Sequence, residues 1–338
     1  MKVLLTGGAG YIGSHVVLSL LDKGHEVVVI DDLSTGYKRL IPKNVKLYEC
    51  NINNTYKIEK IITSIKFDLV MHFAGFIKVE ESVSNPEKYY ENNTDNAIKL
   101  FETCFKNDLN NIIFSSTAAT YGNPINSFSI SEDEKLNPIN PYGRSKAKTE
   151  KYLLENKHRL NSIILRYFNV AGSDKKMRSG LISHKASHLI KIISEVAIGK
   201  RNKISIYGKD YNTHDGTAIR DFIHISDLAD IHLVVAKYLL DNKKTNIFNC
   251  GYGKGYSVLD IIKAANKITN NKIKYVFSER RSGDPEQLVA NVDKIKKYIN
   301  WTPVHNNLNT IISSAIDWEK KLWRESIKGA LREMIKKI

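Results

Sequence analysis

Short apolar runs alternate with longer amphipathic stretches through the first half of the chain. The apolar runs that read as buried strands cover residues 2–5, 26–30, 46–50, 69–73 and 111–116. The stretches that read as helices between them cover residues 14–23, 58–65 and 86–105. Because strand and helix alternate, the sequence predicts an α/β fold with a doubly wound parallel sheet. Ligands of such sheets bind beyond the carboxyl ends of the strands.

A glycine-rich turn joins the first expected strand to the first expected helix. Gly7, Gly10 and Gly13 stand at this turn. Glycines are needed there for a tight turn, for close approach to a pyrophosphate and for packing of the helix on the strand. The N-terminus of the helix then faces the phosphates. The turn predicts a dinucleotide-binding Rossmann unit.

The second expected strand closes on two acids, Asp31 and Asp32. An acid at this place binds the ribose hydroxyls of NAD and repels the 2′-phosphate of NADP, so the sequence favours NAD. Lys38 and Arg39 follow nearby and are basic residues of the kind that accept such a phosphate.

The stretch PYGRSK, residues 141–146, carries the candidate chemistry. On a helix, Tyr142 and Lys146 lie on one face, one turn apart. An ammonium beside a phenol favours the phenolate and lowers the tyrosine pKa, which makes the pair a proton acceptor and donor near neutral pH. Thr117 follows the strand at 111–116 and is a candidate hydroxyl partner that bonds the same substrate oxygen. The alternative is an exposed helix with a lysine and no catalytic role.

Composition narrows the classes of function. The chain has 338 residues, a net charge of +15 and three cysteines, Cys50, Cys104 and Cys250, without metal-like spacing. Sparse cysteines favour a reducing cytoplasm over a disulfide scaffold. The lysines are scattered rather than gathered in a basic tract, which argues against nucleic-acid binding. No apolar run is long enough for a membrane helix, and the first apolar run is too short for a signal peptide.

Further motifs extend the pattern: HFAG at 72–75, SSTAATYG at 115–122, RYFNVAG at 166–172, GTAIRDFIHISDLAD at 216–230 and RRSGDP at 280–285. With them the chain resembles the extended short-chain dehydrogenase/reductases and, more narrowly, the UDP-glucose 4-epimerases, over residues 1–323. The resemblance implies tightly held NAD and reversible oxidation at C4 of a UDP-hexose such as UDP-glucose or UDP-galactose. It implies that Tyr142 removes the proton of the sugar 4-hydroxyl group. It also implies that Lys146 holds Tyr142 ionised and bonds the nicotinamide ribose, with Thr117 at the family's Ser or Thr position.

The resemblance also implies binding residues. Those expected to contact the cofactor are Gly7, Gly10, Tyr11, Ile12, Gly13, Asp31, Asp32, Asn51, Ile52, Phe73, Ala74, Gly75, Asn92, Lys146 and Phe168. Those expected to contact the substrate are Thr117, Tyr142, Asn169, His188, Leu189, Ser205, Tyr207, Arg220, Arg281, Asp284 and Leu288.

Some positions depart from the family or stay open. Asn51 stands where the family usually has Asp, so we expect altered adenine contacts rather than lost binding. His188 replaces the usual Asn and either donates to a pyrophosphate oxygen or is an ordinary surface histidine. Tyr207 either stacks on uracil or is a core tyrosine. Leu288, intermediate in bulk, leaves N-acetylated sugars undecided.

Two further observations concern the reaction. Related dehydratases carry an acidic pair directly after the Ser or Thr at the strand end, and this chain has Ala118 and Ala119 there. The absence of an acid disfavours elimination and favours simple epimerisation. Asp221, His224 and Asp227 have side chains of the kind that bind metals. Their segment, however, has the pattern of a strand that leads into a helix, and hydride transfer needs no metal. We therefore expect no metal site.

The pattern changes after residue 172. Residues 175–183 are polar and residues 184–198 read as an amphipathic helix. We expect an NAD-binding Rossmann domain at 1–173 and a smaller α/β substrate lobe at 174–323, with some chain crossing between them.

Residues 324–338 extend past the resemblance as a basic amphipathic helix. Such a helix either packs on the rest of the protein or on a second subunit, or contacts a membrane. We expect that it packs on the rest of the protein or on a second subunit and that the protein has no membrane partner. We also expect a homodimer. The alternative functions are a UDP-N-acetylhexosamine 4-epimerase and a catalytically silent NAD-sensing protein.

Overall fold

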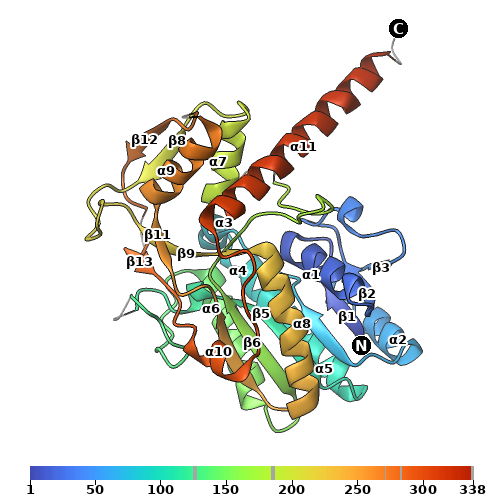
Figure 1. Ribbon diagram of the computed structural model, residues 1–338. Coiled ribbons are helices and arrows are strands. Elements are labelled where there is room, and N and C mark those ends of the chain that lie inside the picture. The colour runs from blue at the N-terminus through green and yellow to red at the C-terminus, as the bar shows by residue number, and fades with distance from the viewer. Residues whose placement is uncertain (125–127, 184–186, 271, 282–283, 336–338) are drawn as a thin grey trace.

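The computed structural model describes residues 1–124, 128–183, 187–270, 272–281 and 284–335, with side chains through Lys328. Its main feature is a seven-stranded sheet in the order β10-β6-β5-β4-β1-β2-β3 (Figure 1). All six strand pairings in this sheet are parallel, which confirms the predicted doubly wound sheet. The strands are β1 (Lys2–Thr6), β2 (Glu26–Asp31), β3 (Lys46–Glu49), β4 (Leu69–His72), β5 (Asn111–Thr117), β6 (Asn161–Tyr167) and β10 (Asn246–Cys250).

Alternate residues of each strand point to opposite faces of the sheet, and both faces are covered by helices. Val3 and Leu5 belong to one core with side chains of α1 (Tyr11–Asp22) and α8 (Ile225–Asn242). Leu4 belongs to a second core with residues of α2 (Thr55–Ser64), α5 (Asn96–Lys106) and α6 (Pro141–Glu155). The near-continuous apolar strands of the sequence follow from this burial on both sides.

The helix expected at 86–105 is divided into three segments. It consists of α4 (Pro86–Tyr90), a π-helical turn (Glu91–Asp95) and α5. A π-helical turn is rare and is found mostly at functional sites. This one lies beside α6, the helix that carries Tyr142 and Lys146. Smaller elements are α3 (Val79–Ser84), α10 (Asp293–Tyr298) and two 3-10 turns, η1 (Lys38–Leu40) and η3 (Ala118–Thr120).

A second body of strands and helices lies beyond the carboxyl edge of the main sheet (Figure 1). Its strands are β7 (Asn169–Ala171), β8 (Ile204–Tyr207), β9 (Ile219–His224), β11 (Gly255–Ser257), β12 (Tyr275–Ser278) and β13 (Gln287–Leu288). Its helices are α7 (Leu189–Ala197), α9 (Val258–Thr269) and α11 (Leu308–Ile335). They share a third apolar core that includes Ile193, Ile261 and Ile311. The chain returns from this body to the main sheet through α8 and β10.

Two helix boundaries differ from the prediction. The helix expected from residue 184 begins at Leu189, because His188 has an extended backbone with φ −72° and ψ 126°; residues 184–186 lie outside the described residues. At the C-terminus, α11 runs without a break through residue 324, so the expected extension is the end of a longer helix. Its last turns project away from the body (Figure 1), and Trp323 and Ile327 are exposed. Within the described ranges, no helix has the length and hydropathy needed to cross a bilayer.

Candidate active site

The glycine turn after β1 presses against the end of β4. Gly7 has φ +75°, and a Cβ on it would lie 2.4 Å from the backbone nitrogen of Ala74. A Cβ on Gly13 would lie 2.2 Å from the Gly7 carbonyl oxygen. Two of the three glycines are therefore required by backbone approach alone. This close approach of the backbone is the role that the sequence predicts for glycines in a dinucleotide-binding turn.

The first turn of α1 has no capping side chain. Its N-cap is Gly10, which makes no side-chain hydrogen bond to the helix. Such a helix start offers backbone N–H groups and a positive dipole end to an anion. Tyr11 stands at this start, and its hydroxyl donates to the Gly172 carbonyl oxygen at 2.7 Å. The residues present therefore fit the diphosphate of a dinucleotide.

The acids after β2 are held by the surrounding backbone. The Asp31 carboxylate accepts from the N–H groups of Ala9 and Leu33, each at 2.8 Å. Burial raises the pKa of Asp31, and these two hydrogen bonds oppose the rise. Asn51 donates to the Asp32 carboxylate at 2.6 Å. Asp31, Asp32 and Asn51, three of the predicted cofactor residues at the ends of β2 and β3, therefore lie together at one edge of the sheet.

Both basic residues that follow Asp31 and Asp32 meet carboxylates. Lys38 pairs with Glu49, and Arg39 pairs with Glu325 of α11 at 3.1 Å. These pairs are exposed and contribute little stability. They do give each cation a partner other than a ligand phosphate, in keeping with a preference for NAD.

The catalytic candidates meet where β5 ends and α6 begins. Pro141 opens α6, and the Asn140 side chain accepts from the Gly143 N–H at 2.8 Å, which caps the helix. Tyr142 and Lys146 lie one turn apart on this helix. Thr117 ends β5, and its side chain lies near enough to the Tyr142 phenol to lower the pKa of that phenol. The structure thus brings together all three residues that the sequence singled out.

The protonation of this group differs from the sequence-based expectation. Burial raises the pKa of Tyr142, and the hydrogen bond with Thr117 opposes the rise. The expectation that Lys146 lowers this pKa is wrong for the chain alone. Lys146 is buried, and its Nζ donates to the Ser115 carbonyl oxygen at 2.9 Å. Burial lowers the pKa of Lys146 to about 8, and the charge of Glu150 opposes the fall.

Asn93, which the sequence analysis did not select, organises this corner. Its Oδ1 accepts from the Phe76 N–H at 2.8 Å, and its Nδ2 donates to the Phe76 carbonyl oxygen at 2.9 Å. Thr149 of α6 donates to the Asn93 carbonyl oxygen at 2.8 Å. The predicted cofactor residue Asn92 donates to Asn93 Oδ1 at 3.1 Å. The pair of adjacent asparagines, Asn92 and Asn93, within an expected helix was the sequence feature that could have indicated this role.

The remaining cofactor candidates line the same edge of the sheet. Gly75 lies beside Lys146, since a Cβ on it would be 3.3 Å from the Lys146 Nζ. The Phe73 ring lies 5.0 Å from the ring of His232. Phe168 follows β6 and is buried, as is Ile52 after β3.

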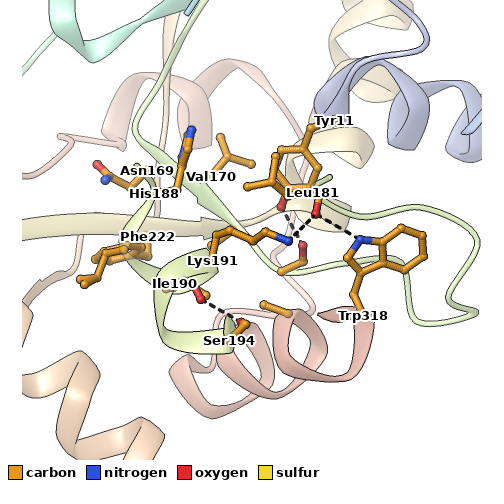
Figure 2. A pocket seen from close by; sticks show the side chains of 14 residues that line it. Tyr11, Asn169, Val170, Leu181, His188, Ile190, Lys191, Ser194, Phe222 and Trp318 are labelled. Atoms are coloured by element: carbon orange, nitrogen blue, oxygen red, sulfur yellow. Dashed lines mark hydrogen bonds between the residues drawn. The ribbon is translucent and has the colours of Figure 1, made fainter. Parts of the chain in front are cut away.

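A cavity opens between the turn at Tyr11 and the second body (Figure 2). Its lining includes Tyr11 and the substrate candidates Asn169, His188 and Leu189. Thr117, Tyr142 and Lys146 are not in its lining, so the cavity lies apart from the three catalytic candidates.

The wall of this cavity is fixed by residues that the sequence analysis missed. Lys191 and Trp318 both point at Leu181 (Figure 2) and donate to its carbonyl oxygen, at 3.3 and 3.2 Å. Lys191 also forms a buried ion pair with Glu319 of α11. A Cβ on Gly180 would lie 2.5 Å from the Trp318 ring. These contacts join segments far apart in sequence, so no local pattern reveals them.

The other substrate candidates form two pairs near β8 and β9. Arg220 forms an ion pair with Asp284, and the Arg281 guanidinium lies 3.9 Å from the centre of the Tyr207 ring. The Asp284 N–H donates to the Arg281 carbonyl oxygen at 3.2 Å, which connects the pairs. The Tyr207 side chain is exposed, so of the two alternatives for this residue the core tyrosine is excluded.

Two predicted substrate residues complete this group. Ser205 shares the exposed face of β8 with Tyr207. Leu288 is buried in β13, in register with Arg220 of β9.

The three residues that resemble a metal set have separate partners. Asp221 accepts from the N–H groups of Tyr252 and Gly253, at 3.0 and 2.9 Å. His224 accepts from a backbone N–H at the start of α8, and Asp227 pairs with a histidine before α11. In the part of the chain described, one group has ligand atoms within 4.8 Å of one another, namely His214, Asp215 and Asp260. Its carboxylates already bond the start of α9, so we assign no metal there.

Comparison with known proteins agrees with this geometry. A family profile described as "NAD dependent epimerase/dehydratase family" matches residues 3–251. The "UDP-glucose 4-epimerase" of Azospirillum brasilense is 45% identical over 323 residues, which cover 95% of this chain and 92% of that protein. The solved "UDP-Glc/GlcNAc 4-epimerase" of Campylobacter jejuni is 44% identical with a TM-score of 0.82, covering 95% and 99% of the two chains. The UDP-glucose 4-epimerase of Bifidobacterium longum, solved with NAD+ and UDP, is 33% identical with a TM-score of 0.89, covering 95% and 98%.

Proposed function

This chain belongs to the NAD dependent epimerase/dehydratase family, and from that premise we propose that it catalyses the reversible, NAD-dependent epimerisation at C4 of a UDP-hexose. UDP-glucose and UDP-galactose are the proposed pair of substrates. The observation that carries the proposal is that Thr117 at the end of β5 meets Tyr142 and the buried Lys146 of α6, at the carboxyl edge of the main sheet. Cofactors of this fold bind at that edge.

The glycine turn, the open start of α1 and Asp31 are the groups that would hold the dinucleotide. Bound NAD+ supplies a hydride acceptor that later returns the hydride. Tyr142 takes the proton of the sugar 4-hydroxyl while the C4–H bond breaks, which leaves a 4-keto sugar. When the C4–H bond forms again on the other face of the keto sugar, Tyr142 would return the proton to O4.

Thr117 and Lys146 assist Tyr142 in different ways. The Thr117 side chain lowers the pKa of Tyr142 and so favours the phenolate. It also accepts from the Ala119 N–H at 3.1 Å, which orients the hydroxyl. The Lys146 ammonium supplies positive charge one helical turn away. Ala118 and Ala119 place no acid beside the sugar, so nothing at that position protonates a departing hydroxyl.

The proposed activity can be tested on the purified protein, which should release NAD on denaturation and interconvert UDP-glucose and UDP-galactose, with products separated by chromatography. The variant Y142F should retain NAD and lose about 10²-fold to 10⁴-fold in kcat, because the general base is gone. Persisting activity in Y142F would refute the proton-transfer role. A protein free of nicotinamide that leaves every UDP-hexose unchanged, even with added NAD, overturns the function.

A second candidate substrate is a UDP-N-acetylhexosamine. The 44% identical relative is named a UDP-Glc/GlcNAc 4-epimerase. In this chain, Leu288 lies on β13 beside Arg220, and its intermediate bulk suits either sugar. A panel of the glucose, galactose, N-acetylglucosamine and N-acetylgalactosamine derivatives of UDP distinguishes the two. A protein that binds NAD but converts none of the four would instead support the silent NAD-sensing alternative.

We also propose that the chain forms a homodimer in the cytoplasm. The dimer follows from the resemblance to the epimerases, and light scattering on the purified protein checks its mass. The compartment follows from cysteine usage, since Cys50, Cys104 and Cys250 are free and buried.

A further inference from the structure

A buried pair of opposite charges lies directly behind the proposed catalytic residues. Glu150 follows Lys146 by one turn on α6 and is 0% exposed, and Arg166 of β6 is 2% exposed. The Arg166 Nη2 donates to the Glu150 carboxylate at 2.7 Å, and its Nε lies 3.2 Å from both carboxylate oxygens. Ser116 of β5 donates to the same carboxylate. Glu150 is thus held by two strands of the main sheet.

The far side of Arg166 is also fully engaged. Its Nη1 donates to the Tyr121 hydroxyl and to the Glu132 carbonyl oxygen, each at 3.0 Å. Tyr121 in turn donates to the Asn249 side chain of β10 at 2.6 Å. The arginine therefore has little freedom to move, and the place of the Glu150 carboxylate is determined by groups on four different segments.

Stability alone does not account for such a pair. Removing two charges from water costs several kcal/mol for each ion, and apolar residues of similar volume are often as stabilising or more so. The buried pair Glu150–Arg166 is therefore expected to have a functional role in addition to any effect on stability. Lys146, a cation one turn before Glu150 on α6, is the group on which such a role would act.

Several groups face the Lys146 ammonium from the elements packed around it. They are His72 of β4, the Ser115 carbonyl of β5, the Phe114 ring at 4.8 Å, and Tyr142 and Glu150 of its own helix. His72 is buried with its Nδ1 2.7 Å from the Thr6 hydroxyl, and its pKa is lowered to about 3, so it stays neutral. Among these groups in the described chain, Glu150 brings the negative charge.

We propose that Glu150 is a positioning residue for the epimerisation, whose carboxylate, fixed by Arg166 and Ser116, keeps the Lys146 ammonium charged beside Tyr142. This inference rests on the proposed function. Burial lowers the pKa of Lys146 to about 8, and Glu150 opposes that fall. Without the carboxylate, Lys146 loses its proton at a lower pH. The alkaline limb of the kcat profile, where activity falls as Lys146 deprotonates, therefore moves to lower pH.

Two variants and a matched control test this. E150Q removes the charge but leaves Arg166 unpaired, and one unpaired buried charge is strongly destabilising. The double variant E150Q/R166M removes both charges, so its fold does not carry that penalty. E155Q makes the same chemical change on the same helix at an exposed pair with Lys151, away from the site.

The first readout is independent of turnover. In protein made with ¹³C-labelled lysine, the ε-methylene signal of Lys146, assigned by its absence from K146R, is followed against pH. The second readout is the pH profile of kcat for UDP-glucose. Both midpoints should fall by about one pH unit in each folded variant that carries the E150Q change, and E155Q should match the unmodified chain.

The outcomes separate the two proposals. If the unmodified chain epimerises UDP-glucose and the folded E150Q variants keep its Lys146 midpoint and alkaline limb, the role of Glu150 is overturned while the function stands. If the unmodified chain converts no UDP-sugar, the proposed function itself fails. A shifted Lys146 midpoint with a shifted alkaline limb supports both.

Discussion

At the scale of single residues, the contact between Thr117 and Tyr142 matters most. Burial alone raises the pKa of Tyr142 and so disfavours the phenolate that the reaction needs. The Thr117 side chain counteracts part of this effect, because it lowers the pKa of Tyr142. A hydrogen bond to a charged group contributes about 1.5–3 kcal/mol. One hydroxyl is therefore expected to change the rate by about 10-fold to 100-fold.

We predict that T117A lowers kcat for UDP-glucose by this amount at neutral pH. The sign follows because losing the Thr117 hydroxyl raises the pKa of Tyr142 further and leaves less phenolate. T117S keeps the hydroxyl and should stay close to the kcat of the unmodified chain. An unchanged kcat in T117A would remove Thr117 from the mechanism.

At the scale of elements, the π-helical turn between α4 and α5 aligns the catalytic helix. Asn93 in this turn is 0% exposed and binds the Phe76 backbone through both ends of its amide. Thr94 donates to the Ser145 carbonyl oxygen at 2.9 Å, and Thr149 donates to the Asn93 carbonyl oxygen. The turn and α6 are thus held together by hydrogen bonds from both sides. The position of Lys146 beside Gly75 depends on this contact.

We predict that N93A lowers the free energy of unfolding by about 1–3 kcal/mol, because it leaves the half-buried Phe76 N–H and carbonyl without their Asn93 partners. Urea denaturation measures the change. The control N242A removes an exposed amide that bonds within the end of α8 and should change stability by less than about 0.5 kcal/mol. Equal stabilities of N93A and the unmodified chain would show that the turn does not depend on this side chain.

At the scale of the whole molecule, buried histidines make the fold sensitive to acid. Burial lowers the pKa of His72 and His224 to about 3 and that of His15 and His232 to about 4, from an ordinary value of 6.5. These four residues join β1, β4, β6, α1, α8 and α11 through their contacts. They are neutral in the folded chain at neutral pH. Protonating them requires charge inside the core.

We predict that the free energy of unfolding falls as the pH drops from about 6.5 to about 4. In that window the unfolded chain binds protons at histidines that the folded chain keeps neutral, so acid favours unfolding. Asp221 acts in the opposite direction, because burial raises its pKa to about 6 and the folded chain binds its proton first. Burial also raises the pKa of Asp31 and Glu132, which act in the same direction as Asp221. Four histidines against three such carboxyls give a net loss. Urea denaturation at pH 7 and pH 5 checks this, and equal or greater stability at pH 5 contradicts it.

The whole-molecule division of the chain near residue 173 remains our proposal. The main sheet contains β10, which comes from far beyond that point, and α8 covers one of its faces. The chain therefore passes between the two bodies more than once, and a single boundary in the sequence does not separate them completely.

Local patterns in the sequence were sufficient for the architecture of the main sheet. The apolar runs predicted the first five strands to within one residue at each end. The four inner strands give a clear apolar run because they are buried on both faces, whereas the edge strand β3 is only partly buried. The glycine turn was recognisable because Gly7 and Gly13 have no room for a Cβ. The predicted start of the helix at residue 184 was wrong, because α7 begins at Leu189. His188 before it has an extended backbone, and the pattern of apolar residues does not reveal this.

What the sequence by itself determined is the doubly wound α/β fold, the dinucleotide turn and the catalytic pair on one helix, all set by spacing over a few residues. What only the tertiary structure decided is the electrostatic state of that pair. The burial of Tyr142 and Lys146 and the charge of Glu150, held by Arg166 from another strand, depend on segments brought together in space. Desolvation and Coulombic interactions act through distance in the folded chain, not through position along it.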